Sequence, residues 1–243
     1  VYLYRRSNGD AVGVVDGRRI TSLRTSALAA LPAAHVFADA PVRLAVIGSG
    51  EEAREGIRAL GGAATVRSAV IFSPTQANRE ALAAEAREAL GIEVGAAASI
   101  GEALDGADVV YVATAATDAF LAAADIAPLR LVIAVGATHS SHHELHGDVF
   151  GSARQVVVDC ADAGREPGDA VDAAAHGWDP STAVLLGDWL QAPAPVAGGG
   201  PILFKSIGSV EQDLLLARGL LAAAEEQGVG EQIEDVGSLR MMR

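Results

Sequence analysis

The stretch "VRLAVIGSGEEAREG" (42–56) decides the fold of this chain. Apolar and β-branched residues over 42–47 predict a buried strand, and the Glu- and Ala-containing residues from 51 onward predict a helix. Gly48 and Gly50 lie between them, where the chain needs a tight turn. The order strand, glycine turn, helix is typical of the first unit of a sheet whose strands run parallel.

The rhythm continues along most of the 243 residues. Four more apolar, β-branched runs alternate with Ala-rich helical segments, and they cover 66–72, 108–114, 129–136 and 154–159. Strands that alternate with helices in this way predict a parallel sheet with helices on both faces. The predicted fold class is therefore α/β, a Rossmann-type doubly wound parallel sheet.

The two ends of the chain depart from this rhythm. Residues 1–40 contain a "SNGD" turn between two short β-like runs, which predicts a hairpin, and then a helical segment through 21–31. A Pro- and Gly-rich linker over 191–201 precedes "ILFKSIGS" and a last helix. We expect 1–40 and 201–243 to form a small second module beside a dinucleotide-binding domain at 41–200.

Composition excludes several classes of function. The net charge of −13 argues against a nucleic-acid partner, because phosphate binding needs a clustered basic surface. No apolar run is long enough to cross a bilayer and no signal segment opens the sequence, so we expect a cytoplasmic protein that does not enter a membrane. Cys160 is the single cysteine and follows a buried run, which favours a buried strand-end thiol over a nucleophile.

The glycine turn carries the first functional signal. Gly48, Ser49, Gly50 and the small Ala53 form a G-x-G-x-x-A pattern between a predicted strand and a predicted helix. The first glycine permits the turn, the second lets the backbone approach a pyrophosphate, and the helix N-terminus offers N–H groups to the phosphates. The pattern in this context predicts a dinucleotide site.

The end of the second strand bears on which dinucleotide is bound. NAD sites usually carry a carboxylate there for the ribose 2′-hydroxyl, but this sequence has Ser73, Pro74 and Thr75. A 2′-phosphate would not be repelled, and Arg79 or Arg67 could neutralise it. We therefore expect NADP to be preferred, with NAD possible; the alternative is that both arginines are solvated charges.

Several segments, taken in order, resemble the ornithine cyclodeaminase/mu-crystallin family. They are "DGRRITSLRTSALAAL" (16–31), "LAVIGSGEEAR" (44–54), "GADVVYVATAA" (106–116), "IAVGATHSSHHELHGDVFGSARQVVVD" (133–159), "LGDWL" (186–190) and "LFKSIGSVEQDLLLARGL" (203–220). The family transfers hydride to or from the α-carbon of amino acids or their imines with a nicotinamide. The resemblance implies that Arg24 binds the substrate carboxylate, for which a guanidinium fork is well shaped, and that Thr25 faces the cofactor phosphates.

Two departures from the family pattern matter. Family members usually carry several dozen residues, including an active-site lysine, before the position of Val1, so we expect part of the substrate pocket to be absent, unseen or supplied by another chain. The cyclodeaminases also carry an aspartate where this sequence has Thr138, and a hydroxyl cannot hold a charge or act as a base near neutral pH. The resemblance is therefore closer to the ketimine reductases, and cyclodeamination is disfavoured.

Four of the six histidines lie in "THSSHHELH" (138–146). His142 and His146 are four residues apart and could share a helix face as a zinc pair, but the resemblance accounts for the segment as a cofactor-side loop and short helix without metal. His139 could donate a proton to the imine nitrogen. Lys205 could reach the substrate or could be a strand lysine whose ammonium extends to the surface.

These residues lead to one functional hypothesis and one alternative. We expect an NAD(P)H-dependent reductase of an imine (ketimine) carboxylate, acting as a homodimer; the alternative is a non-catalytic nicotinamide-dinucleotide-binding protein or a subunit completed by a partner chain. The candidate catalytic residues are Arg24, Thr138, His139 and Lys205. The candidate cofactor-binding residues are Thr25, Gly48, Ser49, Gly50, Glu51, Glu52, Ser73, Pro74, Thr75, Arg79, Thr114, Ala115, Val135 and Gly136.

Overall fold

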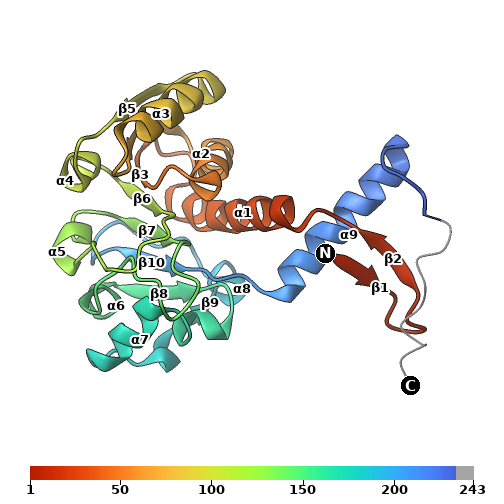
Figure 1. Cartoon of the computed structure of the whole chain (residues 1–243). Helices are drawn as coiled ribbons and strands as arrows, with labels where there is room; N and C mark the ends of the chain where they lie inside the picture. The colour runs from red at the N-terminus through yellow and green to blue at the C-terminus, as the bar shows by residue number, and fades with distance from the viewer. Residues whose placement is uncertain (234–243) are drawn as a thin grey trace. The chain divides into compact units, whose positions relative to one another are not determined.

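A parallel sheet of eight strands forms the centre of the larger part of the chain (Figure 1). A computed structural model describes residues 1–233. The strands lie in the order β5-β4-β3-β6-β7-β10-β8-β9, and every pair of neighbours is parallel. Their bounds are β3 (Val42–Ile47), β4 (Val66–Phe72), β5 (Glu93–Ala96), β6 (Val109–Val112), β7 (Leu131–Ala134), β8 (Gln155–Val158), β9 (Val184–Leu185) and β10 (Ile202–Lys205).

Helices cover both faces of this sheet. Strand side chains alternate between the faces, so two separate apolar cores form, one with Leu44 and Val46 and the other with Ala45 and Ile47. The first core includes α1 (Gly17–Phe37), α2 (Glu51–Ala63), α3 (Gln76–Leu90) and α8 (Leu186–Trp189). The second includes α4 (Ile100–Leu104), α5 (Ala123–Ile126), α6 (Asp148–Ser152) and α7 (Gly168–Ala175). The doubly wound α/β fold expected from the sequence is confirmed.

The described residues divide into two compact units, with residues 1–24 and 209–233 in one and residues 25–208 in the other. This division differs from the expected boundaries at 40 and 201. β10 lies inside the parallel sheet, between β7 and β8, because its residues are all buried and pair in register with both neighbours. A run of four buried residues needs partners on both sides, which an end module cannot supply.

α1 runs further than its sequence indicates. The expected helical segment covers 21–31, yet the helix begins at Gly17 and continues past Pro32 to Phe37. Ala33, Val36 and Phe37 are buried in the first core, and this packing outweighs the backbone hydrogen bond that proline cannot make.

The smaller unit contains an antiparallel hairpin and a long helix. β1 (Tyr2–Tyr4) pairs with β2 (Ala11–Val14), which confirms the hairpin expected around "SNGD". The hairpin lies beside α9 (Val210–Gln227), and Leu3, Ile20 and Ala217 form its small core (Figure 1). Within residues 1–233, no helix is both long and apolar enough to cross a membrane.

The register of the large sheet brings several loops to one edge. Ile47 pairs with Phe72 and Val112, and Ala134 pairs with Val112 and Lys205. The carboxyl ends of β4, β3, β6, β7 and β10 are therefore level. The chain reverses its direction of winding between β3 and β6, and ligands of doubly wound sheets bind at such a switch point.

Candidate functional site

The glycine turn after β3 lies at the switch point and leaves room for a ligand. Gly48 has φ +126°, and a Cβ there would overlap the carbonyl of Ala113 at the end of β6. Gly50 begins α2, and a Cβ on it would meet nothing within 4 Å. A glycine at 48 is thus required by the protein, whereas the space above Gly50 is open. Backbone N–H groups beside open space fit the pyrophosphate of a dinucleotide.

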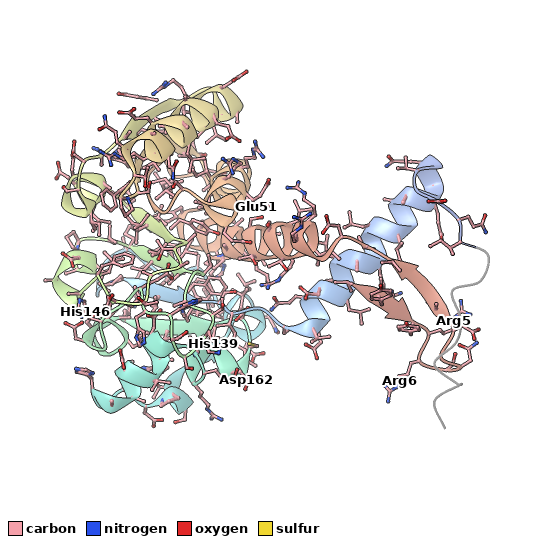
Figure 2. The ribbon with its side chains drawn as sticks, in the orientation of Figure 1. Arg5, Arg6, Glu51, His139, His146 and Asp162 are labelled. Carbon is pink, nitrogen blue, oxygen red and sulfur yellow. The ribbon has the colours of Figure 1, made fainter. Side chains whose placement is uncertain are left out.

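The remaining residues of this turn agree with that geometry. Ala53 is fully buried, so α2 packs closely against the sheet. Ser49 is half-buried. Glu51 and Glu52 occupy the first turn of α2, where the helix dipole stabilises negatively charged side chains. Glu51 lies on the surface at the start of this helix (Figure 2).

The end of β4 carries a hydroxyl and a guanidinium. Ser73 is buried, and its Oγ donates to the carbonyl of Thr75 at 3.3 Å. Arg79 Nη1 donates to the carbonyls of Ser73 and Pro74, at 3.0 and 3.3 Å. Arg67 is exposed near the start of β4, at the opposite end of the strand, so it is wrong as a partner for a group bound at this edge. Only Arg79 of the two arginines lies at the relevant strand end.

The loop after β7 is filled by a side chain that sequence analysis did not assign. Glu144 is fully buried, and each carboxylate oxygen accepts two hydrogen bonds. Oε1 accepts from Thr114 N at 2.7 Å and Thr114 Oγ1 at 2.8 Å, and Oε2 accepts from Gly136 N at 2.9 Å and Ala137 N at 3.0 Å. Burial raises the pKa of Glu144, while Lys205 and the N–H groups of Thr114 and Ala137 oppose that rise. One carboxylate therefore ties the ends of β6 and β7 together.

A buried ion pair, Asp169 with Lys205, contacts the backbone of Glu144. Asp169, in the first turn of α7, accepts from Glu144 N at 2.7 Å and Leu145 N at 3.0 Å through Oδ1. Its Oδ2 accepts from Lys205 Nζ at 2.8 Å, and both side chains are 0% exposed. Lys205 is the one lysine of the sequence, beside seventeen arginines. The expectation that its ammonium extends to the surface is wrong, because the charge is neutralised inside the protein.

The histidines lie along a loop. His142 and His146 do not share a helix face, because residues 137–147 form no helix, and His139 and His146 lie at separate places (Figure 2). His139 is exposed with its Nδ1 3.0 Å from Ser141 Oγ, and His143 Nδ1 is 2.9 Å from Asp172 Oδ2. Within residues 1–233, no group of three or more His, Cys, Asp or Glu side chains is arranged to hold a metal ion.

The other candidates are distributed as follows. Thr114 is half-buried and Ala115 exposed after β6, Val135 is buried in the first core, and Gly136 follows it. Pro74, Thr75 and Thr138 are exposed, and Thr25 is buried on α1. The edge of the sheet thus brings together candidates that follow β3, β4, β6 and β7.

Arg24 belongs to the smaller unit. Its Nε donates to Asp213 Oδ1 of α9 at 3.1 Å, and its side chain is 12% exposed. The guanidinium thus already binds one carboxylate of the protein through one of its N–H groups.

Cys160 follows β8 and is half-buried. Its Sγ donates to the carbonyl of Gly208 at 3.6 Å. Burial and the neighbouring Asp159 raise the pKa of the thiol to about 11. The group is therefore neutral near pH 7, which agrees with a structural thiol rather than a nucleophile.

Sequence reasoning missed Glu144 and Asp169. Glu144 lies within a segment that attracts attention for its histidines, and Asp169 follows a Pro-Gly pair at the start of a helix. Neither residue lies in a local sequence pattern that indicates its hydrogen-bond partners, which are 7 to 36 residues away. Asp169 lies between two buried residues, Gly168 and Ala170, whereas Glu144 follows the half-buried His143 and is two residues from the exposed His146.

Comparison with known proteins finds relatives that match most of this chain. Ketimine reductase mu-crystallin of Rattus norvegicus is 27% identical over 218 residues, which cover 90% of this chain and 67% of that protein. Delta(1)-pyrroline-2-carboxylate reductase of Bacillus cereus is 26% identical over 232 residues, with 93% and 71% covered. The chain thus spans about two thirds to seven tenths of the length of these relatives.

Solved structures share the fold. Delta(1)-pyrroline-2-carboxylate reductase of Thermococcus litoralis, in complex with NADH and L-proline, superposes with a TM-score of 0.89 at 24% identity, covering 96% of this chain and 73% of that one. The iminosuccinate reductase of Paracoccus denitrificans, in complex with NAD⁺, gives 0.86 at 22% identity, with 96% and 72% covered. A model of the ornithine cyclodeaminase/mu-crystallin family matches residues 1–218. The chain belongs to the ornithine cyclodeaminase/mu-crystallin family.

Proposed function

We propose that this protein is an NAD(P)H-dependent reductase of an imine carboxylate. The observation that carries the proposal is the open space above Gly50, at the start of α2 and at the switch point of the sheet. Membership of the family and likeness to ketimine and pyrroline-carboxylate reductases support it.

The chain's own residues have distinct parts in this proposal. When bound, the reduced nicotinamide supplies a hydride to the C=N carbon. The N–H groups at the start of α2 bind the pyrophosphate, and Arg24 binds the substrate carboxylate. His139 is the candidate proton donor to nitrogen, because it is exposed on the loop after β7 and histidine is a common general acid. Thr138 has no charge to contribute, so the substrate must arrive as a preformed imine.

Turnover of defined imines tests the reaction. Pyrroline- and piperideine-carboxylates should drive oxidation of NAD(P)H, followed by absorbance, while ornithine should release no ammonia. Arg24→Ala should lower kcat/KM about 10- to 100-fold, since a lost charge-assisted contact is worth about 1.5–3 kcal/mol. The matched control is Arg18→Ala, on the same helix but 88% exposed, which should leave kcat/KM unchanged. Robust turnover of ornithine would contradict this assignment.

The dinucleotide site has its own test. Gly50→Val should abolish binding of NADPH and NADH in calorimetry, because a branched side chain would occupy the space that the pyrophosphate needs. The variant should still fold, since the backbone of Gly50 has φ −79° and nothing lies within 4 Å of its Cβ position. Equal binding by wild type and variant would refute the site.

We further propose that NADP is preferred over NAD. Ser73 stands where a carboxylate would repel the 2′-phosphate, and the guanidinium of Arg79 lies against the same strand end. Ser73→Asp should lower the preference for NADPH about tenfold or more, because it adds a negative charge beside the phosphate. Tighter binding of NADH than NADPH to the wild type at the same salt concentration would contradict the preference.

A non-catalytic binding protein, or a subunit completed by another chain, is the second candidate. The favouring observation is that Arg24 and Lys205, the two cationic candidates, are each ion-paired with a carboxylate of the protein. Tight binding of cofactor without turnover of any imine would select this candidate over the first.

We also propose a homodimer. The hairpin exposes Tyr2, Tyr4, Val12 and Val14 on one face, an apolar surface of a kind that mediates association. Sedimentation velocity should show twice the chain mass, and Tyr2→Ser with Val14→Ser should shift the protein towards monomer. A wild type that sediments as a monomer at all concentrations would contradict this.

A further inference from the structure

We infer that Glu144 is a positioning residue for the nicotinamide half of the cofactor, held in place by Asp169 and Lys205. The inference rests on the proposed function. In a doubly wound sheet the pyrophosphate lies over the glycine turn after β3, and the adenosine ribose lies at the end of the next strand, here β4. The other half of the dinucleotide must then lie on the opposite side of β3, over the ends of β6 and β7. Glu144 binds both of those strand ends.

The hydrogen-bonding geometry leaves the carboxylate no alternative arrangement. An ionised carboxylate offers about four acceptor sites, and Glu144 has four donors at 2.7 to 3.0 Å, two on each oxygen. Three of the donors are backbone N–H groups. The positions of Thr114, Gly136 and Ala137 are therefore fixed by one side chain.

Gly136 shows that the carboxylate occupies space that another residue would need. A Cβ on Gly136 would overlap Glu144 Oε1 and the backbone of Thr114. The glycine admits the carboxylate, and the carboxylate in turn joins the loop after β6 to the loop after β7. All four of its donors belong to these two loops, so its effect is directed at the ends of β6 and β7 rather than at the glycine turn after β3.

The anchor behind Glu144 is rigid because it is buried and charged. Asp169 receives the N–H groups of Glu144 and Leu145 on one oxygen and the ammonium of Lys205 on the other. Lys205 ends β10, the strand next to β7, so the chain of contacts runs from β10 through α7 to β6 and β7. A misplacement of about 1 Å at reacting groups is costly in hydride transfer, as it is in any reaction that depends on orientation.

Binding of whole and partial cofactors by Glu144→Gln tests this role. The amide keeps the shape of the carboxylate, but its NH₂ group must face either the N–H groups of Gly136 and Ala137 or the N–H group and hydroxyl of Thr114. The affinity for the reduced dinucleotide, measured by calorimetry with NADPH and NADH, should fall about tenfold or more, as expected for loss of a charge-assisted hydrogen bond. The affinity for ADP-ribose and its 2′-phosphate, which lack the nicotinamide, should stay within about twofold of wild type. A purely structural role would weaken both classes of ligand together.

Two further variants make the test decisive. Thr114→Val removes one donor from Glu144 and keeps the branched shape, so it should weaken dinucleotide binding in the same selective way, by a smaller factor, even if Glu144→Gln does not fold. Asp172→Asn, on the carboxylate that contacts His143, should change neither affinity. Parallel loss of both ligand classes, or no loss of dinucleotide affinity in either variant, would overturn the inference. If the wild type binds none of the four probes, the proposed function fails and the inference fails with it.

Discussion

Gly50 and Gly136 both follow a strand at the same edge of the sheet, but they are glycines for opposite reasons. A side chain on Gly50 would enter open space, whereas a side chain on Gly136 would overlap the carboxylate of Glu144. The first loop is open, which fits the cofactor proposed to bind there. The second loop is filled by the protein itself. A glycine after a Rossmann strand therefore indicates a ligand site only when nothing of the protein occupies the space beside it.

The two loops also differ in charge. The open loop offers backbone N–H groups at the start of α2, whose first turn also carries the carboxylates of Glu51 and Glu52. In the filled loop the N–H groups of Gly136 and Ala137 already have an anion, since Glu144 accepts both. The N–H groups of both loops need hydrogen-bond acceptors. The proposed cofactor supplies them in one loop, and a side chain of the protein supplies them in the other.

The largest effect should come from removing the cation behind the filled loop. Lys205→Met keeps the length and apolar stem but leaves Asp169 buried without its partner. The free energy of unfolding in urea should fall by about 3–5 kcal/mol, the usual cost of breaking a buried pair on one side. The double variant with Asp169→Asn should lose less than the sum of the two single changes, because no buried charge is left unpaired. Additive losses would show that the two side chains are not coupled.

A smaller effect on the free energy of unfolding should distinguish alanine substitutions at the two glycines. Gly136→Ala should lower the free energy of unfolding by about 1–3 kcal/mol, because its methyl group overlaps Glu144 and Thr114. Gly50→Ala should change it by no more than about 0.5 kcal/mol, since losing a favoured N-cap residue and restricting the unfolded chain have opposite signs. Urea unfolding of both variants measures the difference. Equal losses would erase the distinction between an open and a filled loop.

The open loop is the part that the sequence makes predictable. The pattern from 42 to 56 is local, because strand, turn and helix follow one another and each has its own periodicity. Five strands of the sheet can be located in the same way, and the turn residues reveal the hairpin near Val1. Boundaries are less predictable, since the continuation of α1 beyond Pro32 depends on packing against distant residues.

The contacts of the filled loop cannot be predicted from the sequence, because they join residues that are far apart along the chain. The expectation that β10 belongs to an end module is wrong, since nothing in "ILFK" tells that this strand enters the sheet between β7 and β8. From the sequence, Lys205 could be a catalytic or a surface residue, and only the fold shows it beside Asp169. The histidines draw attention to the correct stretch, but the residue that organises it is Glu144.

The smallest effect concerns pH and shows whether the filled loop stabilises the fold through its charge. Burial raises the pKa of Glu144 above its ordinary value of 4.5, although Lys205 and two backbone N–H groups oppose the rise. A carboxyl group with a raised pKa binds its proton more tightly in the folded chain than in the unfolded chain. Its contribution to stability is therefore fully present below about pH 4.5 and is lost as the pH rises through the raised pKa.

Glu144→Gln isolates this contribution, because glutamine has no proton to release. The free energy of unfolding of wild type minus that of Glu144→Gln should be greatest below about pH 4.5, decrease as the pH rises through the raised pKa, and then level off. Urea unfolding of both proteins over a series of pH values measures the difference, and other carboxylates cancel in the subtraction. A difference that grows with pH would show that Lys205 and the N–H groups outweigh burial. The ionised carboxylate would then stabilise the filled loop as well as position it.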